Sequence, residues 1–362
     1  MIPRRLDITM PLRRALPPRT YLLALAMILG PFQGGCQSAA KPVFPQLEPA
    51  PVWPAAPDQP RIRYVGALSG ERDLHRVPSG WEALRGVFTG PRPPIGFLTP
   101  TAVAVSDDLV FVCDRQLGGV HVLNLATRDY ALWTSAGDER FGMPMDVTLC
   151  DGKLAVADAR RKVVDLFTLG GEWLSRVGDG LLERPASLAW DASRRELWVL
   201  DSAAHACLVF DLSGELKRSI GGRGAGPLQF NYPAGLAYSP ALGALVADSM
   251  NFRVQIIGEN RSPMIFGDKG DAAGNFALPR DLAVDSAGHI YVLDSQFENV
   301  QVFDRAGRLL MAFGEEGSDP GEFSLPSGIT IDASDRIWVA DTYNRRVQVF
   351  QYLSEDASWA QE

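Results

Sequence analysis

The sequence has few of the side chains that bind transition metals or carry redox chemistry. Its 362 residues include four histidines and four cysteines, none at metal-ligand spacing or in a haem-attachment C-x-x-C-H motif. Three cysteines, Cys113, Cys150 and Cys207, lie in separate apolar runs. An odd number cannot all pair internally, so we expect small core residues and leave one disulfide open.

Long apolar runs are also missing, and the one near the start fits an export signal. The stretch at 21–32 has 12 residues, too few for the roughly 20 of a spanning helix, and five arginines precede it. Small residues then lead to Cys36, which resembles a lipobox, although Gln33 stands where leucine is usual and ordinary cleavage stays open. We expect a lipoprotein-type signal peptide at 1–35 and lipidation of Cys36.

Residues 36–60 have the composition of a spacer. Seven of the 24 residues at 37–60 are prolines, and such a segment reaches on the order of 70 Å when extended. Gln37 differs from the aspartate that typically retains lipoproteins at the inner membrane. We therefore expect a stalk at 36–60 and a lipid-anchored envelope protein, at the outer membrane and facing the periplasm.

Basic charge is scarce once the export signal is set aside. Without the five arginines and one aspartate of the first 35 residues, 30 basic and 42 acidic side chains remain, a net charge of −12. Such a surface repels nucleic acid, so partners of that class are not expected.

What the sequence does have is an internal repeat. Residues 245–256, LVADSMNFRVQI, return nearly unchanged as IWVADTYNRRVQV at 337–349. Weaker copies extend the series to six aspartates spaced 43 to 47 residues apart: Asp114, Asp158, Asp201, Asp248, Asp294 and Asp341. A period of this length over most of the chain indicates a repeat architecture.

Each unit predicts four short antiparallel strands. The unit begins with an apolar run headed by proline, such as 279–284. A turn follows, and then a second run that ends at the aspartate. The third run alternates between apolar and polar residues, and a fourth run, such as 309–313, completes the unit. A lone four-stranded sheet exposes two apolar faces and needs neighbours. The fold class is therefore all-β, a six-bladed β-propeller at 61–353 with blades from residue 100 and a polar tail at 354–362.

The sixth unit lacks a fourth strand, so the ring needs one from elsewhere. Residues 61–68, RIRYVGAL, alternate as such a strand does, and we expect them to pair with the last blade and close the ring. The insertion at 69–98 predicts a short helix near 79–88. We expect this insertion to cover exposed blade edges, with capping of the channel as the alternative.

The repeat residues themselves are expected to be structural. An aspartate at a strand end can accept backbone N–H groups of the following turn, and a site would not be copied six times around a ring. Where Asn251 with Arg253, or Asn344 with Arg346, completes the unit, the guanidinium is expected to tie the turn to the carboxylate.

These motifs resemble those of NHL-repeat proteins, whose pattern is P-x-G-[IL]-A-V-D followed by V-A-D-S-x-N-x-R-V-Q-V-F. The resemblance covers residues 100–352, is clearest in the fourth and sixth units, and extends to bacterial six-bladed NHL lipoproteins. It implies an envelope binding scaffold without an agreed substrate. A zinc lyase of this architecture carries histidines directly after the repeat prolines, and none of the six positions is histidine here.

The start of each inner strand should line the channel mouth. Only Asp146 and Asp281 place carboxylates there, with Arg280 beside the second, and the three could hold a cation or a polar ligand. The alternative is that each of the two carboxylates is structural and accepts hydrogen bonds within a turn. We predict no catalytic residue and no cofactor, with calcium as the candidate ion.

The expected function is a non-enzymatic scaffold that binds a protein, peptide or glycan at the cell envelope. The alternative is a calcium-dependent hydrolase or lyase whose site lies at the channel mouth.

Overall fold

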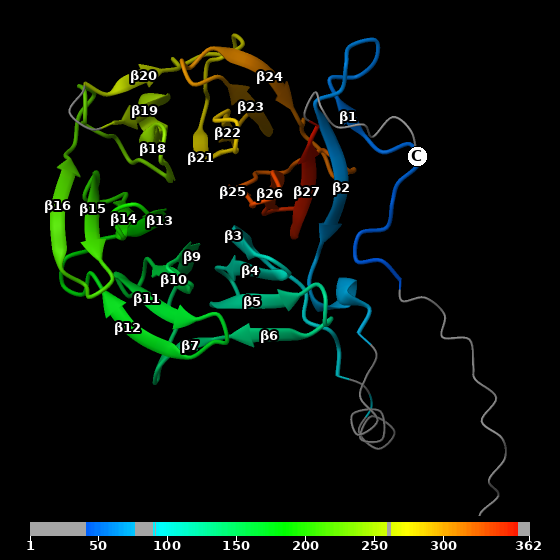
Figure 1. Ribbon diagram of the computed structural model, residues 1–362, viewed down its shortest axis with the longest axis horizontal. Coiled ribbons are helices and arrows are strands. Elements are labelled where there is room, and N and C mark those ends of the chain that lie inside the picture. The colour runs from blue at the N-terminus through cyan, green and yellow to red at the C-terminus, as the bar shows by residue number, and fades with distance from the viewer. Residues whose placement is uncertain (1–40, 77–89, 91, 259–261, 354–362) are drawn as a thin grey trace, which may run out of the picture. The chain divides into compact units, whose positions relative to one another are not determined.

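The computed structural model describes residues 41–76, 90, 92–258 and 262–353. In this part of the chain six antiparallel sheets form a ring, with one edge strand of each sheet facing the central axis (Figure 1). The predicted all-β, six-bladed propeller is confirmed. The signal peptide, Cys36, the helix expected near 79–88 and the polar tail lie outside the described residues.

Each blade has four strands, which follow one another from the axis outward. Blade 1 contains β3 (Pro100–Ser106), β4 (Leu109–Asp114), β5 (Gly119–Asn124) and β6 (Tyr130–Trp133). Blade 2 contains β9 (Pro144–Cys150), β10 (Lys153–Asp158), β11 (Val163–Thr168) and β12 (Trp173–Val177). Blade 3 contains β13 (Pro185–Asp191), β14 (Glu196–Asp201), β15 (Ala206–Asp211) and β16 (Leu216–Gly221).

The second half of the ring repeats this order. Blade 4 contains β17 (Gly235–Ser239), β18 (Gly243–Asp248), β19 (Arg253–Ile257) and β20 (Met264–Phe266). Blade 5 contains β21 (Pro279–Val284), β22 (Ile290–Asp294), β23 (Asn299–Phe303) and β24 (Leu309–Phe313). Blade 6 contains β25 (Gly328–Ile331), β26 (Arg336–Asp341), β27 (Arg346–Tyr352) and β2 (Ile62–Leu68).

Short elements complete the described fold. A two-stranded hairpin, β7 (Ser135–Ala136) and β8 (Glu139–Arg140), joins blades 1 and 2. The helices are two 3-10 turns, η1 (Glu71–Leu74) and η2 (Ser249–Asn251). Neither these turns nor any other described segment forms a helix long and apolar enough to cross a bilayer.

Neighbouring inner strands approach closely at the axis. Two of them, β17 and β25, begin two residues after the proline expected to open them, at Gly235 and Gly328. A Cβ atom at Gly235 would lie 2.5 Å from Cα of Asp281, and one at Gly328 would lie 2.4 Å from the carbonyl oxygen of Thr101. Only glycine allows the next blade to lie this near.

The core consists of apolar layers between successive blades. One cluster joins blades 5 and 6 through Tyr291, Leu293, Ile337 and Phe350, each fully buried, and equivalent clusters fill the other junctions. Burial of one such side chain contributes about 1.5–3 kcal/mol. Stability therefore depends on an unbroken ring, because each blade buries its faces only against its neighbours.

The three cysteines of the described residues belong to this core. Cys113, Cys150 and Cys207 are buried and free, so the disulfide left open by the sequence does not form. Burial raises the pKa of all three thiols, to about 12 for Cys150. They are therefore protonated and unreactive at neutral pH.

The N-terminal strand closes the ring as predicted. β2 pairs with β27 in antiparallel register, from Ile62 opposite Tyr352 to Leu68 opposite Val347. Alternate side chains of β2, at Ile62, Tyr64 and Leu68, are buried against blades 5, 6 and 1. Figure 1 shows β2 on the outer edge of blade 6, beside the last strand of the chain.

The structure differs from the expectation of a free stalk at 36–60. Within its described part, β1 (Val52–Trp53) pairs with β2 and adds a fifth strand to blade 6. The Trp53 ring lies 5.9 Å from that of Phe313 and 5.8 Å from that of Phe350. The apolar side chains among the prolines explain the difference, because they bury surface on the propeller that a polar spacer would leave in water.

The described part of the insertion lies against a blade junction. Leu74 and Phe97 are buried in the cluster that joins blades 6 and 1, together with Val110 and Trp338. An isolated bridge between Gly70 and Gly96 holds the two ends of the insertion together. The described ends of the insertion therefore cover the edges of blades 6 and 1.

Replacement of Trp53 by alanine tests whether this segment belongs to the domain. We expect Trp53→Ala to lower the free energy of unfolding by about 2 kcal/mol, because the indole covers Phe313 and Phe350 and is only half-buried. Leu47→Ala is the matched control, since Leu47 is 41% exposed in the same segment. Urea denaturation measures both, and equal stability of the two variants would restore the free-stalk interpretation.

Candidate functional site

The six repeat aspartates are fully buried and hold turns. Asp201 is representative: Oδ1 accepts the N–H groups of Ala203 and Ala204 at 3.1 and 3.0 Å, and both carboxylate oxygens accept the N–H of Arg184 at 3.0 Å. Each carboxylate thereby fixes the end of the second strand to the segment that leads into the first. Their oxygens are used inside the blade, which leaves no face for a ligand.

Two blades add an arginine to this arrangement. The Nε atom of Arg253 lies 2.9 Å from Oδ2 of Asp248, and that of Arg346 lies 2.7 Å from Oδ2 of Asp341. Asn251 and Asn344 donate to the same oxygens at 2.8 and 2.9 Å.

The remaining guanidinium nitrogens hold the loop that enters the blade. Those of Arg253 donate to the carbonyl oxygens of Ala225, Gly226 and Gln229. The arginine thus ties the inter-blade loop to the strand end, a role within the scaffold.

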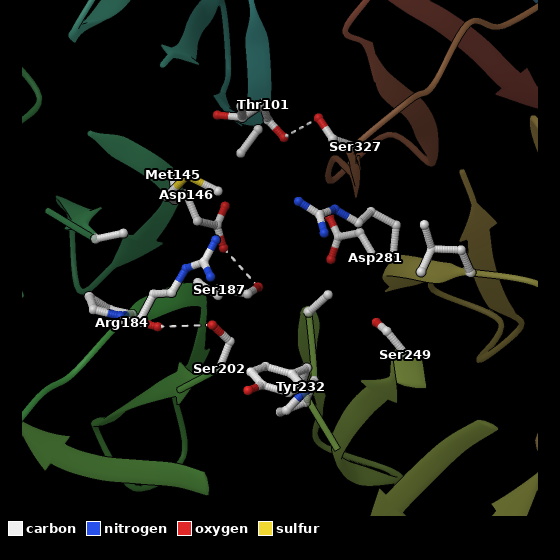
Figure 2. A pocket seen from close by; sticks show the side chains of 18 of the residues that line it. Thr101, Met145, Asp146, Arg184, Ser187, Ser202, Tyr232, Ser249, Asp281 and Ser327 are labelled. Atoms are coloured by element: carbon white, nitrogen blue, oxygen red, sulfur yellow. Dashed lines mark hydrogen bonds between the residues drawn. The ribbon is translucent and has the colours of Figure 1, made fainter. Parts of the chain in front are cut away.

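The channel mouth is where the side chains from all six blades converge. A cavity of about 130 Å³ lies there. Its polar lining residues include Thr101, Asp146, Arg184, Ser187, Ser202, Tyr232, Ser249, Arg280, Asp281 and Ser327. Figure 2 shows Asp146 and Asp281 facing each other across this cavity, with Arg184 reaching in from the turn before β13.

The structure therefore brings together the three residues that the sequence singled out at the mouth. Asp146, Arg280 and Asp281 line one cavity, and both carboxylates also line a second cavity of about 260 Å³ between the inner strands. The two aspartates lie where the mouth meets the interior of the channel.

Both carboxylates also tie neighbouring blades together. Oδ2 of Asp146 accepts the hydroxyl of Ser187 at 2.9 Å and the N–H of Leu188 at 2.7 Å, and Oδ1 accepts the N–H of Val147 at 2.8 Å. Oδ2 of Asp281 accepts the N–H of Ile329, in blade 6, at 2.8 Å. Each aspartate thus binds backbone of the next inner strand.

Burial makes both groups weaker acids. It raises the pKa of Asp146 to about 6, although three hydrogen bonds act in the opposite direction. Burial also raises the pKa of Asp281 well above its ordinary range, and the nearby charge of Asp146 adds to this. The pair therefore retains a proton at pH values where surface aspartates have none.

This predicts a loss of stability with rising pH. A carboxyl group whose pKa is raised by folding contributes fully below its unfolded pKa of about 4 and loses that contribution as pH passes the folded pKa. For Asp146 the loss therefore falls between about pH 4 and about pH 6 and is complete above that, and Asp281, whose pKa is also raised, adds a loss in the same direction. We expect the Asp146 carboxyl alone to cost on the order of 2–3 kcal/mol between pH 4 and pH 8.

The measurement is urea denaturation of Asp146→Asn/Asp281→Asn across that range. Each asparagine keeps one acceptor oxygen, for the N–H of Leu188 or of Ile329 in the next inner strand, and cannot ionise, so the variant should lose this part of the pH slope. Asp304→Asn, in an exposed hairpin, is the control for general charge effects. A double variant with the slope of the parent would show that the carboxyl pair does not titrate as described.

The donor set at the mouth is a poor match for calcium. Calcium takes six to eight oxygen ligands, whereas both oxygens of Asp146 already accept N–H or O–H groups and Arg280 lies beside Asp281. Among the described residues, no three histidine, cysteine or acidic side chains are grouped so as to hold a metal ion. The arrangement suits a polar or anionic ligand better than a cation.

Several mouth residues were not singled out from the sequence. Tyr232 (47% exposed) and Met250 (43%) line the cavity, and Leu325 (39%) and Tyr343 (67%) occupy the equivalent positions of the repeat in blade 6; we call these four exposed side chains the mouth rim. Arg184 and Ser202 also line the cavity. Each lies within two residues of a repeat proline or aspartate, so comparing these flanking positions between the units would have identified them.

Comparison with known proteins agrees with the fold. The model of the NHL repeat matches residues 276–303 and 323–350, in blades 5 and 6, so the strong repeat expected in blade 4 lies outside the matched residues. NHL repeat-containing protein 3 from Homo sapiens is 35% identical over 124 residues, which cover 31% of this chain and 36% of that protein. The match thus spans about a third of the human protein.

Solved structures resemble the ring as a whole. Virginiamycin B lyase from Staphylococcus aureus is 12% identical, with 71% of this chain and 96% of that chain covered at a TM-score of 0.53. An auxiliary nutrient binding protein from Bacteroides ovatus is 14% identical, with 71% and 70% covered at a TM-score of 0.57. At these identities the likeness concerns the fold. The chain is a six-bladed β-propeller with NHL repeats in its fifth and sixth blades.

Proposed function

We propose that the protein is a binding scaffold of the cell envelope whose ligand, a protein, peptide or glycan, binds at the channel mouth. One observation carries this proposal: a cavity lined by residues of all six blades lies beside the exposed, partly aromatic mouth rim. Binding proteins of this fold exist, as the nutrient binding proteins from Bacteroides are so named. Their names support a binding role without specifying a partner.

The chemistry of the mouth rim suits such ligands. Tyr232 and Tyr343 present aromatic side chains that are 47% and 67% exposed, and Met250 adds a flexible apolar side chain. Exposed aromatic residues around a pocket are typical anchors for peptide side chains, and their hydroxyl groups add hydrogen bonds. The rim can therefore contact a ligand larger than the cavity itself.

The enzymatic alternative has less support in the geometry. Asp146 and Asp281 accept backbone N–H groups, and among the described residues lining the mouth there is no histidine or cysteine to complete a catalytic set. If the site were a calcium-dependent hydrolase or lyase, the purified protein should contain about one calcium per chain. Metal analysis by mass spectrometry decides this, and we expect well under that amount.

We further propose that a lipid on Cys36 anchors the chain to the outer membrane. The export signal and the small residues before Cys36 support this. Metabolic labelling with a fatty acid should mark the parent and leave Cys36→Ser unlabelled, and membrane fractionation should place the parent in the outer membrane. Recovery in the inner membrane would refute the proposed location, and an unlabelled parent would refute the anchor.

The binding proposal is tested by capture from detergent-solubilised envelopes. The parent should retain a specific protein or glycan that Tyr232→Ala/Tyr343→Ala retains poorly. Leu174→Ala/Leu310→Ala is the matched control, because these exposed residues lie on the outer strands β12 and β24. Equal capture by all three proteins would contradict binding at the mouth.

A further inference from the structure

The channel mouth has positive charge without fixed partners. Arg280 lines the cavity half-buried, Arg184 lines it from the turn before β13, and Arg115 follows Asp114 in blade 1. Within the described residues, none of the three guanidinium groups forms a hydrogen bond or an ion pair. Their side-chain donors are therefore available to a ligand.

Other half-buried arginines of the chain do have partners. Arg253 and Arg346 bind the repeat aspartates, and Arg218 forms two hydrogen bonds of 2.7 Å with Glu196. A buried guanidinium without a partner is costly, because it loses water and gains no anion in exchange. The lack of a partner at Arg280 therefore distinguishes it from the arginines of the scaffold.

The charged neighbours of Arg280 leave its positive charge poorly compensated. Burial lowers the pKa of Arg280, and repulsion from Arg115 and Arg184 lowers it further, while Asp281 alone acts in the opposite direction. Asp281 is an incomplete counter-charge, because its own pKa is raised well above the ordinary range. The site therefore has an excess of positive charge that a bound anion would neutralise.

The size of the cavity limits what can enter it. At about 130 Å³ it is smaller than the roughly 300–1,000 Å³ of pockets that enclose whole drug-sized ligands. It can hold a single small group, while the rest of a ligand lies on the mouth rim. Guanidinium groups bind carboxylate and phosphate through paired, charge-assisted hydrogen bonds.

We propose that the channel mouth binds one oxyanion group, a carboxylate or a phosphate, with Arg280 as its central contact and Arg115 and Arg184 at its edge. This rests on the proposed function and specifies the ligand chemistry at that site. The neutral form of the neighbouring aspartate pair can donate a hydrogen bond to the same group. The ligand is then a free small anion or the acidic group of a peptide or glycan.

The test uses the purified protein at constant ionic strength, with chloride as the background anion. Calorimetry compares inorganic phosphate, N-acetylglycine and glucuronate with two uncharged partners, N-acetylglycinamide and glucose. We expect at least one acid to bind about tenfold or more tightly than its uncharged partner, and phosphate to bind if a free anion suffices. The preferred acid distinguishes a peptide from a glycan source.

Substitution of Arg280 tests whether this residue is the central contact of the anion. Arg280→Gln should weaken binding of the preferred anion by about tenfold or more, yet melt no lower than the parent without anion, because the guanidinium has no partner to lose. Arg308→Gln is the matched control, since its hairpin lies at the opposite end of blade 5. Equal affinity of the parent and Arg280→Gln, or no preference for any acid, would overturn the proposal.

The two proposals can fail separately. If the envelope ligand is captured through the mouth rim and Arg280→Gln captures it equally well, the anion site is wrong and the scaffold function stands. If no envelope ligand is captured but phosphate binds through Arg280, the anion site stands and the scaffold function is wrong.

Discussion

Deletion of residues 61–68 is expected to abolish the cooperative unfolding transition and to produce aggregates. β2 lies between β1 and β27, so its removal exposes the edge of β27 and leaves β1 without a partner. The deletion also removes Ile62 and Leu68, both fully buried, from two blade junctions. An unpaired edge strand and an opened ring both favour association between chains. Size-exclusion chromatography and thermal melts followed by circular dichroism measure the effect.

Substitutions within the strand provide the control. Ile62→Asp/Leu68→Asp should reproduce much of the loss, because both side chains are buried, whereas Arg63→Ser should not, because Arg63 points to solvent. A synthetic peptide of residues 50–70, added in trans, should restore part of the native signal of the truncated chain. A truncated chain that melts like the parent would show that the ring closes without this strand.

Replacement of a repeat aspartate should have the second-largest effect. Asp341 is fully buried, and its carboxylate accepts a hydrogen bond of 2.8 Å from the backbone N–H of Ser324. Three side chains also donate to it at 2.7–3.0 Å, those of Asn344, Arg346 and Gln348. Asp341→Ala leaves the guanidinium of Arg346 without its anion. We expect the free energy of unfolding to fall by about 3–5 kcal/mol.

A double-mutant cycle shows whether the loss arises from the ion pair. Asp341→Ala and Arg346→Met together should cost less than the sum of the two single changes, because the second removes the stranded charge. Asp304→Ala, in an exposed hairpin, should change stability far less than Asp341→Ala, because its ion pair with Arg308 is screened by solvent. Urea denaturation gives all values, and strict additivity within the cycle would contradict the described pairing.

The repeat made most of the fold predictable because its signals are local. The inner strand expected at 279–284 and the outer strand expected at 309–313 have those bounds as β21 and β24. The closing strand could be recognised because its alternation matches that of a fourth strand and the last blade lacks one. The absence of a fourth strand in the sixth unit therefore predicted that the N-terminal strand closes the ring.

The association of Trp53 with blade 6 could not be read from the sequence. Its surroundings are rich in proline, which indicates an extended spacer, and a two-residue strand has no periodicity of its own. Its ring partners, Phe313 and Phe350, belong to the far end of the chain. Only tertiary packing, which outweighs local composition, places the indole there.

The candidate site was predictable in part for a similar reason. Asp146 and Asp281 occupy equivalent positions, the second after a repeat proline, and Arg280 is the residue before Asp281, so the repeat itself placed all three at one mouth. Arg184 and Arg115 are at other positions of the repeat unit. They come near Arg280 only through the radial arrangement of the blades, which brings turns of different type to the same axis.

Site-specific photo-crosslinking in intact cells tests the central claim, ligand binding at the channel mouth, most directly. A photoreactive phenylalanine analogue would replace Tyr343, which is 67% exposed on the mouth rim, or Leu310, which is 53% exposed on β24 at the outer edge of the ring. We expect a discrete crosslinked product from position 343 and none from position 310, and Arg280→Gln should reduce the product at 343. Equal products from both positions, or a product from 310 alone, would contradict binding at the mouth.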